Sequence, residues 1–166
     1  MSTKENLAAA FAGESQANRK YLAFAEKADQ DGLPHVARLF RATAAAETIH
    51  AHAHLRAMEG IGSTLDNLNE AIEGEGYEFQ EMYPPFLTEA EDEGHKKAKV
   101  SFRNAMAVEE VHHGLYREAL QAVQAGGDLP AAGVHVCDVC GHTVRGDAPD
   151  RCPVCGAGTK HFFAVD

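Results

Sequence analysis

Apolar and small residues recur every three or four positions through most of the first 125 residues, as on the buried face of a helix. This pattern predicts four helices, at about residues 2–31, 35–59, 64–93 and 95–125. Glycines and a proline separate them, at Gly32-Leu33-Pro34, Gly60-Ile61-Gly62 and Gly94. Four helices of about 25–30 residues with short connections predict an up-and-down four-helix bundle, an all-α fold.

Local signals refine these helices. Ser2 and Glu5 have the spacing of a capping box, and Ser63 or Thr64 can cap the third helix. Pro84-Pro85 lies inside the third helix. We expect a kink or a local break there, because proline lacks the amide hydrogen that an α-helix uses.

The chain changes character after residue 125. Residues 126–133 are rich in glycine, alanine and proline and predict a linker. Residues 134–166 contain too few apolar side chains for a core of their own, so a metal must organise this small segment of strands and loops. The predicted organisation is a helical domain at 1–125, a linker at 126–133 and a metal-organised domain at 134–166.

Charge narrows the range of partners. The formal net charge is −10, from 25 acidic and 15 basic side chains. A negative field repels phosphate, so neither nucleic acid nor an anionic membrane is an expected partner. No apolar run approaches the ~20 residues of a membrane span, and the first residues do not resemble a secretory signal. We therefore expect a cytoplasmic protein.

Several carboxylates lie where a helix should be apolar. The predicted inward seams contain Glu14 on the first helix, Glu47 on the second and Glu109 on the fourth. A buried carboxylate must be paired, protonated or bound to metal, because leaving water is costly for a charge. No lysine or arginine falls on these seams. Metal cations are therefore the expected partners.

Two of these carboxylates belong to Glu-x-x-His pairs, whose members project from one side of a helix and can bind one ion together. One glutamate from each of two helices, with Glu-x-x-His from each of the other two, is the ligand set of di-iron carboxylate bundles. A single pair would be a common coincidence, but two pairs in matching helix order also form a faint internal repeat. The predicted two-metal ligands are Glu14, Glu47, His50, Glu78, Glu81, Glu109 and His112.

Two tyrosines stand near these positions in the helical register. Tyr21 and Tyr116 each follow a candidate ligand by seven residues, close to two helical turns. They either hydrogen-bond ligand carboxylates or pack in the core. The remaining helical histidines are interpreted as structural and are left out of the site.

All four cysteines lie in the last segment, as two C-x-x-C pairs that are each followed by glycine: Cys137, Cys140, Cys152 and Cys155. In a reducing compartment, such close pairs indicate a metal site before disulfides. The glycines permit tight turns that point backbone N–H groups at sulfur. The spacing alone leaves iron and zinc equally open.

Together these motifs resemble the rubrerythrin family over essentially the whole chain. The resemblance is carried in order by Gly13-Glu14-Ser15-Gln16-Ala17, Glu47-x-x-His50, Glu78-Phe79-Gln80-Glu81-Met82-Tyr83-Pro84 and Glu109-x-x-His112-x-x-x-Tyr116. The tail is similar to rubredoxin through Cys152-Pro153-Val154-Cys155-Gly156-Ala157 and Phe162. His142 and Gly158-Thr159 depart from the usual rubredoxin pattern, which affects packing more than the ligands.

The resemblance implies a ferritin-like bundle that holds two bridged iron ions, and a rubredoxin-like domain with one iron on four cysteines. Zinc can replace iron at either site in a given preparation. The resemblance also implies that Glu81 is an extra ligand, which exchanges with His50 at one iron between redox states. The implied activity is the reduction of hydrogen peroxide to water in oxidative-stress defence. Electrons would come through the tetracysteine centre from an external donor, a rubredoxin or an NAD(P)H-dependent reductase.

Assembly follows from helix length together with the resemblance. The helix between His112 and Ala125 spans ~20 Å, so we expect the chain's own tail to lie far from His112. A head-to-tail homodimer, with each tail docked on the partner's bundle, would shorten that distance.

Two other functions stay open at this point. A ferroxidase or oxygen-reducing oxidase would react with O₂ in preference to H₂O₂. An iron-storage or metal-binding protein with a structural zinc tail would have a colourless tail, whereas a ferric tetracysteine site is red.

Overall fold

The computed structural model describes residues 2–165 and has four long helical segments followed by a small sheet. The chain forms two compact units, with the boundary between Gly62 and Ser63. The elements are α1 (Thr3–Gln30), α2 (Pro34–Ala57), α3 (Thr64–Tyr77), η1 (Glu78–Met82), α4 (Tyr83–Asp92), α5 (Lys96–Gln124), β1 (Val134–Cys137), β2 (Thr143–Arg145), η2 (Thr159–His161) and β3 (Phe162–Val165).

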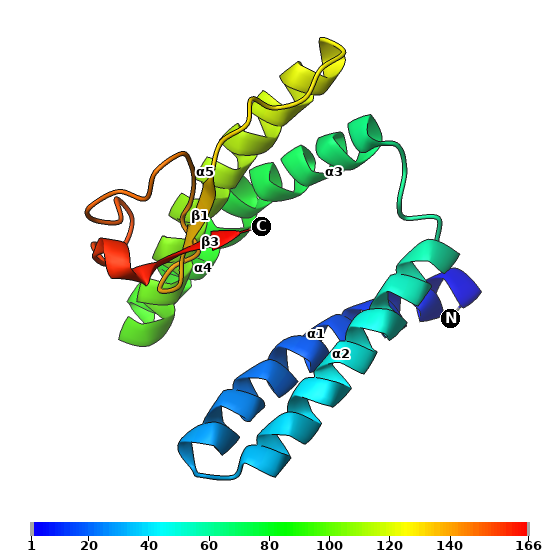
Figure 1. Cartoon of the computed structure of the whole chain (residues 1–166), viewed down its shortest axis with the longest axis vertical. Helices are drawn as coiled ribbons and strands as arrows, with labels where there is room; N and C mark the ends of the chain where they lie inside the picture. The colour runs from blue at the N-terminus through cyan, green and yellow to red at the C-terminus, as the bar shows by residue number, and fades with distance from the viewer. Residues whose placement is uncertain (1, 166) are drawn as a thin grey trace. The chain divides into compact units, whose positions relative to one another are not determined.

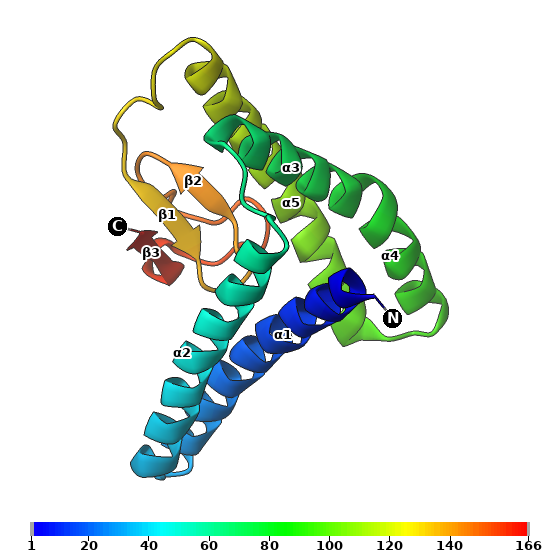
Figure 2. The ribbon, with the colours of Figure 1, turned by 90° about the vertical axis from the view of Figure 1, so that its right-hand side faces the viewer.

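The first unit is a hairpin of α1 and α2, which lie side by side (Figures 1 and 2). Alanines on both helices are buried at the contact and Phe40 packs against them, so the backbones approach closely. Asn18 strengthens the pair, since its Nδ2 donates to the carbonyl of Ala44 at 2.7 Å and to Thr48 Oγ1 at 2.9 Å. The predicted capping box is present, with Ser2 and Glu5 bonded reciprocally.

In the second unit, the segment from α3 to α4 runs alongside α5 (Figures 1 and 2). The expected irregularity occurs at η1, which is a π-helical turn. The N–H of Tyr83 bonds to the carbonyl of Glu78, five residues back. Pro84 and Pro85 have no N–H to donate to the preceding turn, and the wider turn directly before them keeps the helix continuous.

Each unit contains a similar trio of aromatic rings. Tyr21, Phe24 and Phe40 have centroids 5.6 to 6.3 Å apart in the first unit. The second unit repeats this with centroids 5.7 to 6.4 Å apart, using Tyr83, Phe86 and Phe102. The two halves of the helical region are therefore structurally related, as the faint sequence repeat indicates.

The tail forms an antiparallel sheet in the order β2-β1-β3. It folds back on α5, where Thr143 Oγ1 lies 3.0 Å from His112 Nε2. The expectation that the chain's own tail lies about 20 Å from His112 is therefore wrong. That estimate followed the helix outward to its end, whereas the linker reverses the chain and returns β2 along the same helix.

The N-terminus of α3 offers a test of this fold. Ser63 caps α3 by a reciprocal box with Asp66. We predict that Ser63→Ala lowers the free energy of unfolding of the metal-loaded protein by about 1 kcal/mol, because an orphan helix N–H loses its acceptor. Denaturant unfolding measures the change. The control is Ser101→Ala on the exposed surface inside α5, where alanine should be neutral or slightly stabilising; equal losses in both variants would contradict the capping role.

Candidate metal centres

The first cluster lies on the α1–α2 hairpin and combines Glu14, Glu47 and His50. One potential ligand atom from each residue falls within 4.8 Å of those of the others. His50 Nδ1 lies 2.9 Å from Glu47 Oε2. Hydrogen bonds with His50, and secondarily with Glu14, hold the pKa of Glu47 below its usual range. The three-residue spacing on α2 thus directs carboxylate and imidazole to one point.

The second cluster lies between α3 and α5 and combines Glu75, Glu109 and His112. His112 Nδ1 lies 2.9 Å from Glu109 Oε2 and 3.6 Å from Glu75 Oε2. Glu75 Oε2 is buried and has no hydrogen-bond partner. Burial raises the pKa of Glu75 to about 7, and the nearby charge of Glu109 acts in the same direction while that of His112 opposes it.

The negative charges of this cluster also act on two further side chains, Glu78 and Tyr83. Burial, followed by the charge of Glu109, raises the pKa of Glu78. Burial and then the charges of Glu78, Glu109 and Glu75 raise the pKa of the Tyr83 phenol. Both side chains therefore lie in the negative field of the carboxylates.

Glu81 differs from Glu78 in its surroundings, although the sequence analysis predicts both as ligands. Its side chain is exposed, whereas that of Glu78 is half-buried; neither residue belongs to a metal-binding cluster among the described residues. The reason is the π turn, which takes more residues per turn than an α-helix and so rotates Glu81 away from the face of Glu78. Glu75 precedes Glu78 by three residues in regular helix and shares its face.

Sequence reasoning missed Glu75, although a signal for it was present. The spacing from Phe40 to Glu47 and His50 equals that from Phe102 to Glu109 and His112. Aligning the aromatic trios in the same way pairs Glu14 with Glu75, with one additional residue before Tyr83. That residue is the one the π turn accommodates. The structure brings the other predicted residues into two separate groups, one with Glu14, Glu47 and His50 and one with Glu109 and His112.

The two predicted tyrosines occupy different surroundings. Tyr116 lines a cavity of about 360 Å³ together with Glu75, His112, Leu115 and Thr143. Tyr21 packs in the aromatic trio of the first unit. Among residues 2–165 neither phenol makes a hydrogen bond to a candidate ligand, so that role stays a prediction.

Both clusters fit metal cations. Each provides two carboxylates and one imidazole, the hard oxygen and nitrogen donors that suit iron. Within the described chain no lysine or arginine pairs with these carboxylates. The buried Oε2 of Glu75 has no hydrogen-bond partner, and a bound cation would satisfy it.

The four cysteines form a separate, closed site. All are free thiols, and their sulfurs lie 3.7 Å apart for Cys137–Cys155 and 3.5 Å apart for Cys140–Cys152. Metal–sulfur bonds of about 2.3 Å in a tetrahedron give sulfur–sulfur edges of about 3.8 Å. The spacing is thus far too long for disulfides and right for a bound ion.

The knuckles keep this geometry through their glycines. Gly141 and Gly156 have φ of +85° and +79°, and their N–H groups bond to the carbonyls of Cys137 and Cys152. Burial raises the pKa of Cys140. Burial acts in the same direction on Cys152, but the N–H groups of Cys155 and Val154 outweigh it and lower the pKa of Cys152 to about 7. Backbone donors thus already favour a thiolate.

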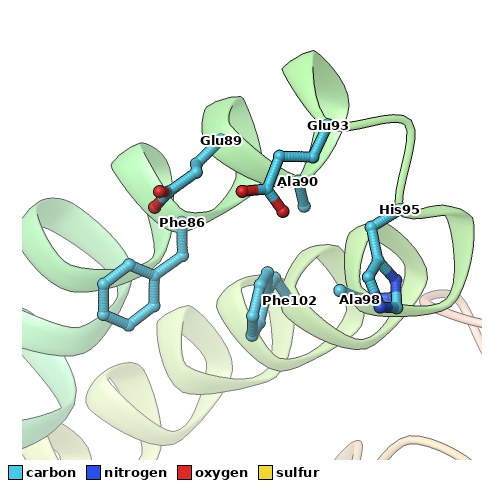
Figure 3. A pocket seen from close by; sticks show the side chains of 7 residues that line it. All are labelled: Phe86, Glu89, Ala90, Glu93, His95, Ala98 and Phe102. Atoms are coloured by element: carbon cyan, nitrogen blue, oxygen red, sulfur yellow. The ribbon is translucent and has the colours of Figure 1, made fainter.

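Another cavity of about 360 Å³ lies between α4 and α5 (Figure 3). The rings of Phe86 and Phe102 line one side, Glu89 on α4 and its C-cap residue Glu93 border the cavity, and His95 lies at the end nearest the α4–α5 connection. These three polar residues do not form a metal-binding group in the part of the chain that is described. The pocket continues the apolar face of α5 and is not a candidate metal centre.

Comparisons with known proteins agree with both parts of this arrangement. The rubrerythrin family model matches residues 5–120, and the model for the rubrerythrin rubredoxin-like domain matches residues 135–163. Rubrerythrin-2 of Clostridium acetobutylicum is 34% identical across 98% of this chain and 96% of its own length. Nigerythrin of Nitratidesulfovibrio vulgaris is 39% identical across 98% of this chain and 86% of its own length.

Solved structures give the same result. Nigerythrin in a partially reduced state and in a fully reduced, all-ferrous state each match with a TM-score of 0.59 and 36% identity, over 99% of this chain and 87% of theirs. The predicted fold class is confirmed: a ferritin-like helical region followed by a small rubredoxin-like domain. The four cysteines form a rubredoxin-like iron site, and the glutamate–histidine clusters suit a di-iron site. No helix among residues 2–165 is long and apolar enough to span a membrane.

Glu75 supplies a test of the metal argument. We predict that Glu75→Gln weakens iron binding yet raises the free energy of unfolding of the metal-free protein by about 1–2 kcal/mol at about pH 8, because a buried, unsatisfied carboxylate is removed. In the folded protein this carboxyl is protonated below its pKa of about 7, so its destabilising effect grows between the unfolded-state value of 4.5 and that pH. The difference between variant and parent should therefore shrink toward about pH 5.

Denaturant unfolding of the metal-free protein at both pH values measures this effect. Glu73→Gln, on an exposed position of the same helix, is the matched control and should change neither stability nor binding. Destabilisation of the metal-free protein by Glu75→Gln would contradict the account.

Proposed function

The chain belongs to the rubrerythrin family, and on that premise we propose that it is a non-haem di-iron peroxidase that reduces hydrogen peroxide to water in defence against oxidative stress. Membership of the family implies an oxidoreductase. The peroxidase proposal rests on the two clusters, each with two carboxylates and one imidazole. The same chain also holds a tetracysteine domain that contacts one of these clusters.

The proposed ligands of the iron pair are Glu14, Glu47 and His50 from the first unit, with Glu75, Glu78, Glu109 and His112 from the second. Glu75 is included for its buried, unpartnered oxygen. Glu78 is included because it shares the face of Glu75 and feels the charge of Glu109. Cys137, Cys140, Cys152 and Cys155 hold the single iron of the tail. The domain limits 1–125, 126–133 and 134–166 are retained as part of this proposal.

When bound, the iron pair supplies two electrons that, with two protons, convert one H₂O₂ into two H₂O. The protein's own groups position these ions and handle protons. Burial and then the charges of three carboxylates raise the pKa of the Tyr83 phenol further above its ordinary value near 10, so it keeps its proton at neutral pH and can donate a hydrogen bond beside the cluster. The cavity bordered by Glu75, His112 and Tyr116 gives a small oxidant space next to the same groups.

The partners of this reaction follow the same proposal. Single electrons reach the tetracysteine centre from a rubredoxin or an NAD(P)H-dependent reductase. A cytoplasmic location suits four free thiols. We also propose a head-to-tail homodimer, which the family resemblance supports. The distance argument no longer supports it, because the tail contacts α5 of its own chain. A monomer in light scattering with full activity would reject the dimer.

Stopped-flow mixing of the fully reduced, iron-loaded protein with hydrogen peroxide tests the activity. We expect both centres to reoxidise, with the red colour of the ferric tetracysteine site returning, and peroxide to react much faster than O₂. Faster reaction with O₂ would favour an oxidase or ferroxidase, and a colourless tail would favour a structural zinc site. Failure of either centre to reoxidise with peroxide would reject the proposal.

A matched pair of variants tests the choice of ligands on the third helical segment. Glu78→Gln should weaken iron binding at the carboxylate–histidine site at least tenfold, on the order of the loss caused even by removing a ligand's hydrogen-bond partner. Glu81→Gln should have a much smaller effect, since this side chain is exposed. Iron content after dialysis and the rate of peroxide reduction measure both. The reverse order would restore Glu81 as the extra ligand.

A further inference from the structure

Thr143 connects the tetracysteine domain with a residue of the second cluster. Its Oγ1 donates to the carbonyl of Gly141 at 3.1 Å and lies 3.0 Å from His112 Nε2. Gly141 is the glycine that follows Cys140 in the first knuckle. A methyl group on Gly141 would lie 3.7 Å from the side chain of Val108, so this knuckle sits directly against α5.

The hydrogen-bonding capacity of threonine favours one direction for this chain of contacts. A threonine hydroxyl has a single hydrogen, and in this arrangement it goes to the carbonyl of Gly141. The hydroxyl oxygen then has a lone pair for His112, and this arrangement favours the tautomer with the ring hydrogen on Nε2. In a neutral imidazole this leaves Nδ1 with a free lone pair.

Nδ1 is the ring atom that faces the carboxylates, 2.9 Å from Glu109 and 3.6 Å from Glu75. A lone pair that faces two anionic oxygens is favourable only with a cation bound beside it, whereas the other tautomer would donate from Nδ1 to Glu109. In the tautomer that Thr143 favours, Nδ1 is free to bind metal, and the contact at Nε2 restrains the plane of the ring.

The first cluster lacks a comparable device. Within residues 2–62 the ring of His50 is hydrogen-bonded to Glu47 alone, and its side chain is 57% exposed against 25% for His112. The two histidines of the proposed site therefore differ. The tail domain contacts Nε2 of His112, whereas no hydrogen bond restrains Nε2 of His50 within residues 2–62.

We propose that Thr143 is a positioning residue for the carboxylate–histidine site, and that the folded tetracysteine domain thereby contributes to metal binding at that site. The relay runs from His112 Nε2–H to the Thr143 hydroxyl and on to the carbonyl of Gly141. The turn around the tetracysteine iron thus helps to support a ligand of the iron pair. This inference rests on the proposed ligand role of His112, and its test separates the two.

The test compares full-length proteins whose tetracysteine site holds iron and whose carboxylate–histidine site has been emptied with a chelator. Zinc is then titrated in competition with a chromophoric chelator. Thr143→Val keeps the shape of the side chain and removes the hydroxyl, and it should weaken zinc binding by about 10- to 100-fold. Thr143→Ser keeps the hydroxyl and should bind nearly as the parent protein does.

Thr159→Val is the matched control, because Thr159 also donates its hydroxyl to a backbone carbonyl of the tail but does so at an exposed place away from α5. Its zinc affinity should be unchanged. The visible spectrum of the ferric tetracysteine site should be the same in all variants, which shows that the tail remains folded.

A second readout is independent of affinity. In protein loaded with zinc at both sites, ¹⁵N-labelled histidine reports by NMR which ring nitrogen of His112 carries hydrogen. We expect hydrogen on Nε2 in the parent and in Thr143→Ser, with a shifted or exchange-broadened signal in Thr143→Val. Equal zinc affinity and an equal His112 signal in Thr143→Val and Thr159→Val would overturn the inference while leaving peroxide reduction intact. Failure of the parent to bind zinc at the carboxylate–histidine site would instead count against the proposed function.

Discussion

Carboxylates on helix faces that should be apolar are the constraint on which this molecule depends. Glu14, Glu47, Glu75 and Glu109 are all partly buried, and the described chain offers them no lysine or arginine. Two histidines alone do not balance that charge. The clearest sign is Glu75, whose buried Oε2 has no hydrogen-bond partner and whose pKa is raised to about 7 by burial. Such an arrangement is stable only with protons or metal ions among the oxygens, and function follows from the second choice.

The sequence was sufficient for the elements and for most of the chemistry, because both follow short-range rules. Helix periodicity predicted the four rods, and C-x-x-C-Gly spacing predicted the knuckles, whose positive φ angles require glycine. The spacing of Glu47 with His50 and of Glu109 with His112 is a local property of an α-helix, and the structure brings both pairs together. The choice among Glu75, Glu78 and Glu81 was not local in this sense. It depended on a π turn that shifts every later residue around the helix axis, and regular-helix spacing therefore predicted Glu78 with Glu81 and left out Glu75.

The position of the tail was beyond the sequence for a different reason. A helix has a fixed rise per residue, but a linker rich in glycine and proline has no fixed direction. Extrapolating α5 outward placed the tail far from His112, whereas Thr143 lies within hydrogen-bond distance of its ring. Long-range contact between a metal-organised domain and a helix is set by packing, such as the approach of Gly141 to Val108. No short sequence motif predicts such a contact. The same contact links two metal sites that the sequence presents as separate modules.

The most direct measurement is anomalous X-ray diffraction at the iron absorption edge from crystals of the iron-loaded protein. We predict three iron positions per chain, one within the four sulfurs and two among the carboxylates, with oxygens of Glu14, Glu47, Glu75, Glu78 and Glu109 and the Nδ1 atoms of His50 and His112 as ligands. Anomalous signal at the cysteines alone, with these carboxylates surrounded by water, would contradict the claim that cations make their placement tolerable.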